Sequence, residues 1–223
     1  MSVAIALAME TFGLVVTDGR RVESDGSSVR DDYNKTFTIG NPHLIAASVG
    51  LLEFSGLTVG EHVRQVAEVD GTEPTTLQGA CFRIGERLAT RLGSIDETDV
   101  GFQHRRLELL FVGRGRLTSG NPRICSVGLY PDPSNQRIER AVQLWEPADY
   151  FVTVGDDAAR SRIRLRMPKP ERRFLLADIN HARCRLTDVM TEAIAHCGPH
   201  PLYQHIPACG GVPHVQVLDV ATP

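Results

Sequence analysis

Three side chains near the start of the chain have the types that a hydrolytic site needs: Ser2, Asp18 and Lys35. Methionine aminopeptidase removes Met1 when a small residue follows, so Ser2 would carry both a hydroxyl nucleophile and a free α-amino group. An α-amine titrates near pH ~7.7 to 8, so part of it is neutral at pH 7 and can accept a proton. The sequence therefore predicts an N-terminal serine that supplies its own base.

Lysine is rare in this chain: of its 24 lysines and arginines, only Lys35 and Lys169 are lysines. The lysine ammonium is a compact charge whose pKa can move, which suits a group that tunes a neighbouring nucleophile. Arginine serves elsewhere in the chain wherever a surface cation is needed. Two interpretations of Lys35 stay open here, a charged partner of Ser2 and a solvated strand end.

Short strands are predicted around these side chains. Bulky residues at 3, 5 and 7 alternate with alanines, and a return strand over 14–17 ends at Asp18. The polar segment 20–32 contains Asp25-Gly26 and is predicted to be a loop or hairpin tip. Further strands are expected at 35–39 and 44–49, joined by a turn at Asn41-Pro42. The small residues at 46–48 would let a substrate backbone lie close to the last of these strands.

Helical and strand periods alternate over the remaining chain. Apolar spacing predicts helices over 59–66 and 77–92, then strands over 107–112, 124–130, 138–144 and 150–154, with turns at 113–115 and 131–133. Helices are expected from 155 to 166 and from 186 to 196, and a last strand over 215–220. This order predicts an α+β protein in which two stacked antiparallel sheets lie between helical layers. Residues 1–223 are expected to form one domain, with no internal repeat or linker.

The first 54 residues resemble the proteasome β-subunits and their bacterial relatives. The resemblance rests on the segments SVAIALAM, GLVVTDGRR, YNKTF and LIAASVG. In that family an N-terminal Thr or Ser is followed by an acidic residue at the end of a strand pair, by a lysine opening the third strand, and by an Ala/Gly-rich strand. Ser2, Asp18 and Lys35 match these positions, although Lys35 lies one residue further along than in the family. The resemblance implies the N-terminal-nucleophile (Ntn) hydrolase fold, a four-layer αββα sandwich.

The resemblance also implies roles for individual residues. Ser2 would attack the scissile carbonyl of a polypeptide, while Lys35, held by Asp18, would stabilise charge on the hydroxyl. The backbone N–H of Ala47 would be the oxyanion donor, and Ile45 and Val49 would line the pocket for an apolar side chain before the cut. The resemblance also implies a homo-oligomeric ring and an ATP-dependent unfoldase as a candidate partner. A cytoplasmic location is expected from the cysteine usage and from the lack of a signal peptide or membrane span in the sequence.

The second half of the family pattern is altered in this chain. Asp156 follows Gly155 where the family has a serine, and Ile206 stands where it has an aspartate. The family's Ser-Gly-Gly is replaced by Cys209-Gly210-Gly211. Asp156 has two interpretations: a helix cap, which is favoured, or an acceptor for the Ser2 ammonium. An inactive ring or scaffold subunit and a small-molecule amidase of the same fold therefore remain as competing functions.

Composition and motifs narrow the other classes. A net charge of −3 gives no basic field for nucleic acid, and no apolar run approaches the ~20 residues of a membrane span. Five cysteines without a CxxC pair are expected to be reduced cytosolic thiols. His196, His200 and His205, together with Cys197 and Cys209, match no zinc spacing, so no metal is expected. Because no phosphate loop or dinucleotide fingerprint occurs, no cofactor is expected either.

Overall fold

Two antiparallel sheets form the centre of the computed structural model, which describes residues 2–22, 28–40, 43–68, 75–117, 119–148, 150–168, 178–200 and 203–220. The first sheet has the strand order β12-β1-β2-β13, made of Phe151–Gly155, Val3–Ala8, Phe12–Thr17 and His214–Asp219. The second has the order β11-β10-β9-β6-β5, made of Arg137–Leu144, Ser119–Asp132, Leu107–Arg116, Leu44–Gly50 and Thr36–Ile39. Two short hairpins join β3 (Arg21–Val22) to β4 (Val29–Arg30) and β7 (Glu53–Phe54) to β8 (Leu57–Thr58).

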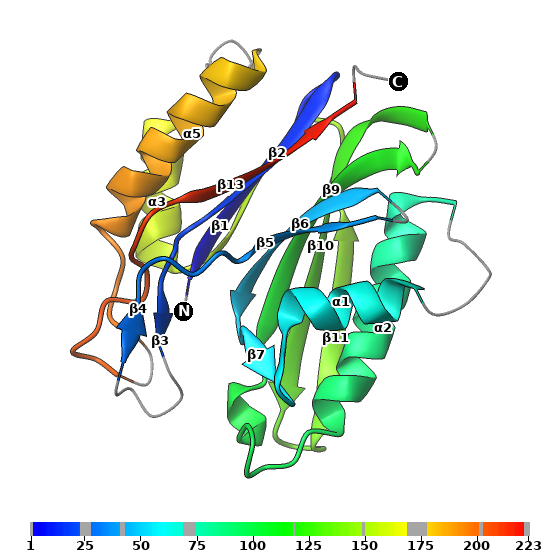
Figure 1. Cartoon of the computed structure of the whole chain (residues 1–223), viewed down its shortest axis with the longest axis vertical. Helices are drawn as coiled ribbons and strands as arrows, with labels where there is room; N and C mark the ends of the chain where they lie inside the picture. Colours follow the sequence, from blue (N-terminus) through cyan, green and yellow to red (C-terminus); the bar gives the residue numbers. More distant parts are fainter. Residues whose placement is uncertain are drawn as a thin grey trace.

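Helices cover the outer faces of the two sheets (Figure 1). Helices α1 (Val59–Glu68) and α2 (Leu77–Gly93) share an apolar cluster with β5, β6, β9 and β10. Helices α3 (Asp157–Arg166) and α5 (Ile179–Ile194) share another with β1 and β2. A single-turn 3₁₀ helix, Phe102–His104, precedes β9. Among the helices in the described part of the chain, none has the length and apolar character needed to cross a membrane.

A third apolar cluster lies between the sheets and uses the small face of β1. Ile5 and Leu7 point to the helices α3 and α5, whereas Ala4, Ala6 and Ala8 face the second sheet. Gly13 on β2 takes part in the same close approach, because a Cβ there would lie 2.4 Å from a methyl carbon of Val112. The alternation of bulky and small residues therefore gives β1 one helix-packed face and one sheet-packed face.

The structure corrects two of the expected boundaries. Residues 113–115, expected as a turn, lie inside β9, which continues to Arg116. The helix expected from 186 begins at Ile179, since the side chain of Asp178 caps it by accepting from Asn180 N and His181 N. Its first turns are mostly exposed and polar, so their apolar period is weak. The expected turns at Asp25-Gly26 and Asn41-Pro42 lie outside the described residues.

The close approach of the sheets can be tested at Ala6, which is fully buried between them. Ala6→Leu should lower the free energy of unfolding by about 1–3 kcal/mol, because added methylenes force the packed sheets apart. The matched control is Ala158→Leu on the exposed side of α3, where the change should stay within about 0.5 kcal/mol. Urea unfolding of both variants measures the difference, and equal stabilities would contradict the packing described here.

Candidate active site

Ser2 precedes β1 and is held by its backbone at the end of β12. The amide of Asp156 donates to the Ser2 carbonyl oxygen at 2.9 Å. Gly155, the last residue of β12, has a φ of +101°, and a Cβ there would lie 2.0 Å from the Ser2 oxygen. A glycine is therefore required for the backbone to approach Ser2 this closely. The Ser2 side chain is buried, so its hydroxyl is surrounded by protein groups rather than by water.

Asp18 follows β2 directly and accepts hydrogen bonds with both of its oxygens. Its Oδ1 accepts from Val3 N at 3.0 Å, which ties the carboxylate to the strand that starts after the serine. Its Oδ2 accepts from the amides of Arg20 and Gly210, each at 3.3 Å. These donors come from three separate segments, and together they compensate for the burial of a carboxylate that is 0% exposed.

Lys35 precedes β5 and joins the other two side chains. Its Nζ donates to Ser2 Oγ at 2.6 Å and forms an ion pair with Asp18 Oδ2 at 2.9 Å. The residue is 2% exposed. Burial lowers the pKa of the Lys35 ammonium, and the neighbouring Asp18 carboxylate opposes that shift. The structure thus brings Ser2, Asp18 and Lys35 together, and Lys35 is not a solvated strand end.

The amides of β6 face alternate edges of the strand, which decides which of them the site can use. Ser48 donates its N–H to the Lys35 carbonyl at 3.1 Å. Ala47 is its neighbour, so the Ala47 N–H points to the opposite edge, where Leu110 of β9 is its partner. The expected oxyanion donor at Ala47 therefore faces away from Lys35. By the same alternation the Gly50 N–H returns to the Lys35 edge, two residues beyond Ser48.

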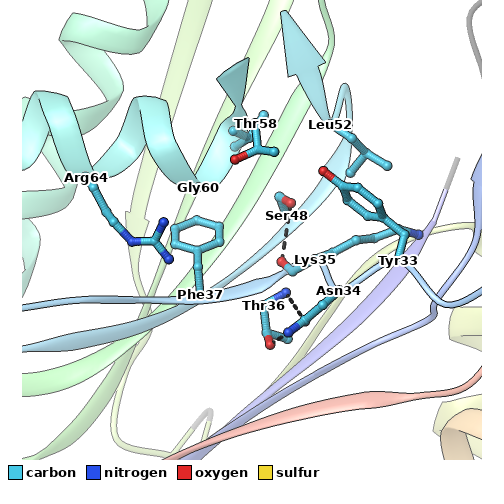
Figure 2. Close-up of a pocket in the computed structure, with 11 residues that line it drawn as sticks. Tyr33, Asn34, Lys35, Thr36, Phe37, Ser48, Leu52, Thr58, Gly60 and Arg64 are labelled. Carbon is cyan, nitrogen blue, oxygen red and sulfur yellow. Dashed lines mark hydrogen bonds between the residues drawn. The ribbon is translucent and has the colours of Figure 1, made fainter. Parts of the chain in front are cut away.

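A pocket of about 110 Å³ opens next to Lys35 between β5, β6 and α1 (Figure 2). Figure 2 shows Tyr33, Phe37 and Leu52 around it, with Ser48 and Lys35 toward the site and Arg64 at the far side. Ile45 and Val49, expected to line such a pocket, instead lie in the cluster between the sheets and are 0% and 3% exposed. Their side chains are on the wrong face of β6, because a shift of one residue reverses the face.

The segment that follows α5 supports the site from the side of the serine. Asp156 is the N-cap of α3: its Oδ1 accepts from Ala159 N at 2.9 Å and from Gly198 N at 3.3 Å. The cap interpretation of Asp156 is thereby confirmed. Ile206 is buried and apolar, so its side chain cannot orient an amine. Sequence reasoning missed two features of the site: the amide of Gly210 and the left-handed backbone of Gly155. The Gly210-Gly211 pair was the available signal for the first, and the Gly155-Asp156 pair for the second.

Within the described residues, no group of three or more His, Cys, Asp and Glu side chains is arranged to hold a metal ion. His200, from the cluster of histidines and cysteines named above, is half-buried, and burial lowers its pKa to about 4. Its ring is therefore neutral at pH 7 and donates or accepts hydrogen bonds as an uncharged group.

Comparisons with known proteins give structural relatives only. No protein-family model and no curated protein sequence matches the chain. A mutant of Anbu from Hyphomicrobium sp. strain MC1 matches with a TM-score of 0.62 and 14% identity, over 98% of this chain and 82% of that one. Anbu from Yersinia bercovieri, described as an ancestral beta-subunit, matches with a TM-score of 0.62 and 13% identity, over 97% and 82%. This likeness shows a shared fold and supports the proteasome-like fold that the sequence resemblance implied.

The approach of Gly155 to Ser2 yields a test of how the serine is positioned. Gly155→Ala should destabilise the protein by about 1–3 kcal/mol, because alanine disfavours this φ and its Cβ would collide with the Ser2 backbone. Gly40→Ala is the control, since a Cβ at Gly40 meets nothing within 4 Å. Thermal unfolding of the two variants should differ clearly, and an undisturbed Gly155→Ala protein would contradict the described strand end.

Proposed function

We propose that this protein is a proteasome-like peptidase in which Ser2, exposed by removal of Met1, is an N-terminal nucleophile. The observation that carries the proposal is the contact of the Ser2 hydroxyl with the buried Lys35 ammonium, which Asp18 pairs on its other side. The proposal includes a single domain with the four-layer αββα sandwich of the Ntn hydrolases. The two sheets with helices on their outer faces support that architecture.

Burying an ion pair costs desolvation free energy, and the attraction between the two charges often fails to recover it. A buried pair therefore suggests a role other than stability, which favours a catalytic site over a scaffold. Replacing such a pair with apolar residues of similar size is often neutral or stabilising, so stability alone does not explain Lys35 and Asp18. The Ser2 hydroxyl contributes nothing to packing that an alanine methyl would not. All three groups are buried. Electrostatic interactions between buried groups are stronger than in water, because the effective dielectric constant is lower.

In the proposed reaction the Ser2 oxygen attacks the scissile carbonyl and its proton passes to the α-amine of the same residue, directly or through one water. The Lys35 ammonium stabilises the negative charge that develops on the hydroxyl oxygen. The amine then gives the proton to the leaving amine of the product, and water hydrolyses the acyl-enzyme. The Gly50 N–H, which faces the Lys35 edge of β6, is the proposed oxyanion donor in place of Ala47, a contact worth ~3 kcal/mol in other hydrolases.

The pocket beside Lys35 is the proposed site for the substrate side chain before the cut. Its walls combine the rings of Tyr33 and Phe37 with the polar groups of Ser48, Thr58 and Arg64. The proposal is therefore a pocket of mixed character rather than the purely apolar one expected from Ile45 and Val49. The resemblance also carries the proposals of a homo-oligomeric ring and an ATP-dependent unfoldase as partner, and the cysteine usage carries that of a cytoplasmic location.

Removal of Met1 is the first requirement of this mechanism. Intact-mass measurement of active protein should show a chain that begins at Ser2. Its rate of peptide hydrolysis should rise as pH increases through ~7.7 to 8, since the neutral α-amine is the reactive form. Acetylation of the α-amine should abolish turnover. An active preparation that retains Met1 would rule out the α-amine as the base.

Substitutions at the three side chains should behave as changes to one unit. Ser2→Ala should abolish hydrolysis of fluorogenic peptides without unfolding, whereas Ser2→Thr should keep measurable activity because its hydroxyl and amine survive. Lys35→Arg should fail nearly as badly as Lys35→Ala, because the fully buried site has no room for a guanidinium. A Ser2→Ala, Lys35→Ala double variant should be little worse than Ser2→Ala alone.

Asp18→Asn completes the series and should lower the rate of peptide hydrolysis. Both Asp18 oxygens accept hydrogen bonds, so an amide at this position would turn its NH₂ group toward a donor. Circular dichroism and thermal unfolding of every variant separate lost chemistry from lost structure. Wild-type rates in Lys35→Ala, or retained activity in Ser2→Ala, would refute the assigned site. Covalent labelling by a peptide boronate separates an active enzyme from a scaffold, and a peptide panel separates a peptidase from a small-molecule amidase.

A further inference from the structure

Cys197 and Cys209 lie directly opposite each other behind the proposed active site. An antiparallel bridge joins Pro199 to Pro207, and the amide of Ala208 donates to the Gly198 carbonyl at 2.8 Å. Continued by two residues along each segment from the bridge, this register sets Cys197 against Cys209. Residues directly opposite in antiparallel pairs have Cα atoms about 4.5–5.5 Å apart, which is within the span of a disulfide.

The side chain of Cys197 is in contact with the backbone of Cys209. The amide of Cys209 donates to the Cys197 sulfur at 3.1 Å, and the Cys197 thiol donates to the Cys209 carbonyl at 3.3 Å. Both sulfurs are unoxidised in this structure, so the pair is a dithiol.

The two thiols differ in ways that suit them to successive steps of an oxidation. Cys197 is half-buried and its sulfur accepts from the backbone N–H of Cys209. A half-buried sulfur can be reached by a peroxide, which a fully buried one cannot. Cys209 is buried, and burial raises the pKa of its thiol, so it stays protonated until a partner sulfur is presented.

The residues that flank the dithiol hold the proposed active site. Gly210, next to Cys209, donates its N–H to Asp18 Oδ2 and accepts at its carbonyl from Gly19 N at 2.9 Å. On the other side, the amide of Gly198, next to Cys197, donates to the Asp156 carboxylate. The backbone amide of Asp156 in turn donates to the Ser2 carbonyl. A change in the Cys197–Cys209 separation therefore acts on the contacts of both Asp18 and Ser2.

We propose that Cys197 and Cys209 form a reversible oxidation site, which peroxides convert to a disulfide that switches off the Ser2 site. Attack of the Cys197 thiolate on a peroxide oxygen breaks the O–O bond and gives a sulfenic acid and hydroxide, or alkoxide from an alkyl peroxide. The Cys209 sulfur then displaces the sulfenic hydroxyl, which leaves as water with the Cys209 proton. Thiol exchange with a reductant restores both thiols.

The other cysteines provide internal controls for this site. Cys184 is exposed on α5 and, unlike Cys197, has no opposing cysteine within the described residues. Cys81 on α2 and Cys125 on β10 lie in the same apolar cluster and are both 0% exposed. Peroxide should therefore oxidise the Cys197–Cys209 pair to a disulfide, convert Cys184 only to single-sulfur products and leave the sealed pair reduced.

The experiment treats the reduced protein with hydrogen peroxide, alkylates the remaining thiols and maps the peptides. No lysine or arginine follows Arg185, so trypsin leaves both cysteines on the peptide 186–223, separate from Cys184. Chymotrypsin cleavage after Tyr203 should release two fragments from reduced protein but leave them linked after oxidation. The oxidised peptide should be lighter by two hydrogen atoms, and dithiothreitol should reverse the change. A pair that stays fully alkylatable while Cys184 is oxidised would overturn the proposal.

Variants assign the two steps and the link to the active site. Cys209→Ser should stop the oxidation at a Cys197 sulfenic acid that a cyclic 1,3-dione traps, whereas Cys197→Ser should form neither product. Cys184→Ser should oxidise like wild type. Because the inhibitory effect rests on the proposed function, it is read in two ways: peptide turnover should fall about tenfold, and hydrogen exchange at the Gly210 amide should accelerate. A disulfide without faster exchange at Gly210 would overturn the switch, whereas a reduced protein without turnover would refute the proposed function alone.

Discussion

The buried carboxylate of Asp18 is the constraint on which the rest of the site depends. A charge that is 0% exposed is tolerated only if donors surround it, and here the donors are an ammonium and three backbone amides. Those donors belong to β1, to the turn after β2, to the start of β5 and to the loop before β13. The carboxylate therefore fixes the first sheet, the second sheet and the C-terminal loop relative to one another. The Lys35 ammonium has further N–H donors besides the one that faces Asp18, and one of them donates to Ser2 Oγ.

Much of this arrangement could be predicted from the sequence because its signals are local. The alternation of β1 marks a strand with a small face, and the Asp18-Gly19 pair marks the end of β2. The scarcity of lysine separates Lys35 from the surface arginines. The helical periods of α1 and α2 depend on apolar residues that are indeed buried against the second sheet. The residue type at a strand end and the spacing within a strand can be read from a short segment, without knowing which distant segments it contacts.

The remaining features could not be predicted because they depend on register and on distant segments. Whether Ala47 or Gly50 turns its amide to Lys35 depends on which β6 residue lies opposite Lys35, and an error of one residue exchanges the edges and the faces of the strand. For that reason the Ala47 amide and the side chains of Ile45 and Val49 point away from the Lys35 edge and its pocket in the structure. The Gly210 amide lies 192 residues from Asp18 in the chain, and no periodic pattern indicates such a contact. The early start of α5 was missed because its cap at Asp178 precedes a polar turn.

The altered half of the site is compatible with the proposed chemistry when its charges are considered together. The Lys35–Asp18 pair is neutral as a whole, so an α-amine beside it gains little by being charged. Asp156 uses its Oδ1 on the amides of Ala159 and Gly198, and Ile206 adds no negative charge where the family has an aspartate. The N-terminus of α3 begins just after the residue that holds the Ser2 carbonyl, and the carboxylates of Asp156 and Asp157 offset its partial positive charge. In this mechanism the loss of the second carboxylate therefore leaves the base intact, while the positioning of the amine passes to Gly155 and Asp156.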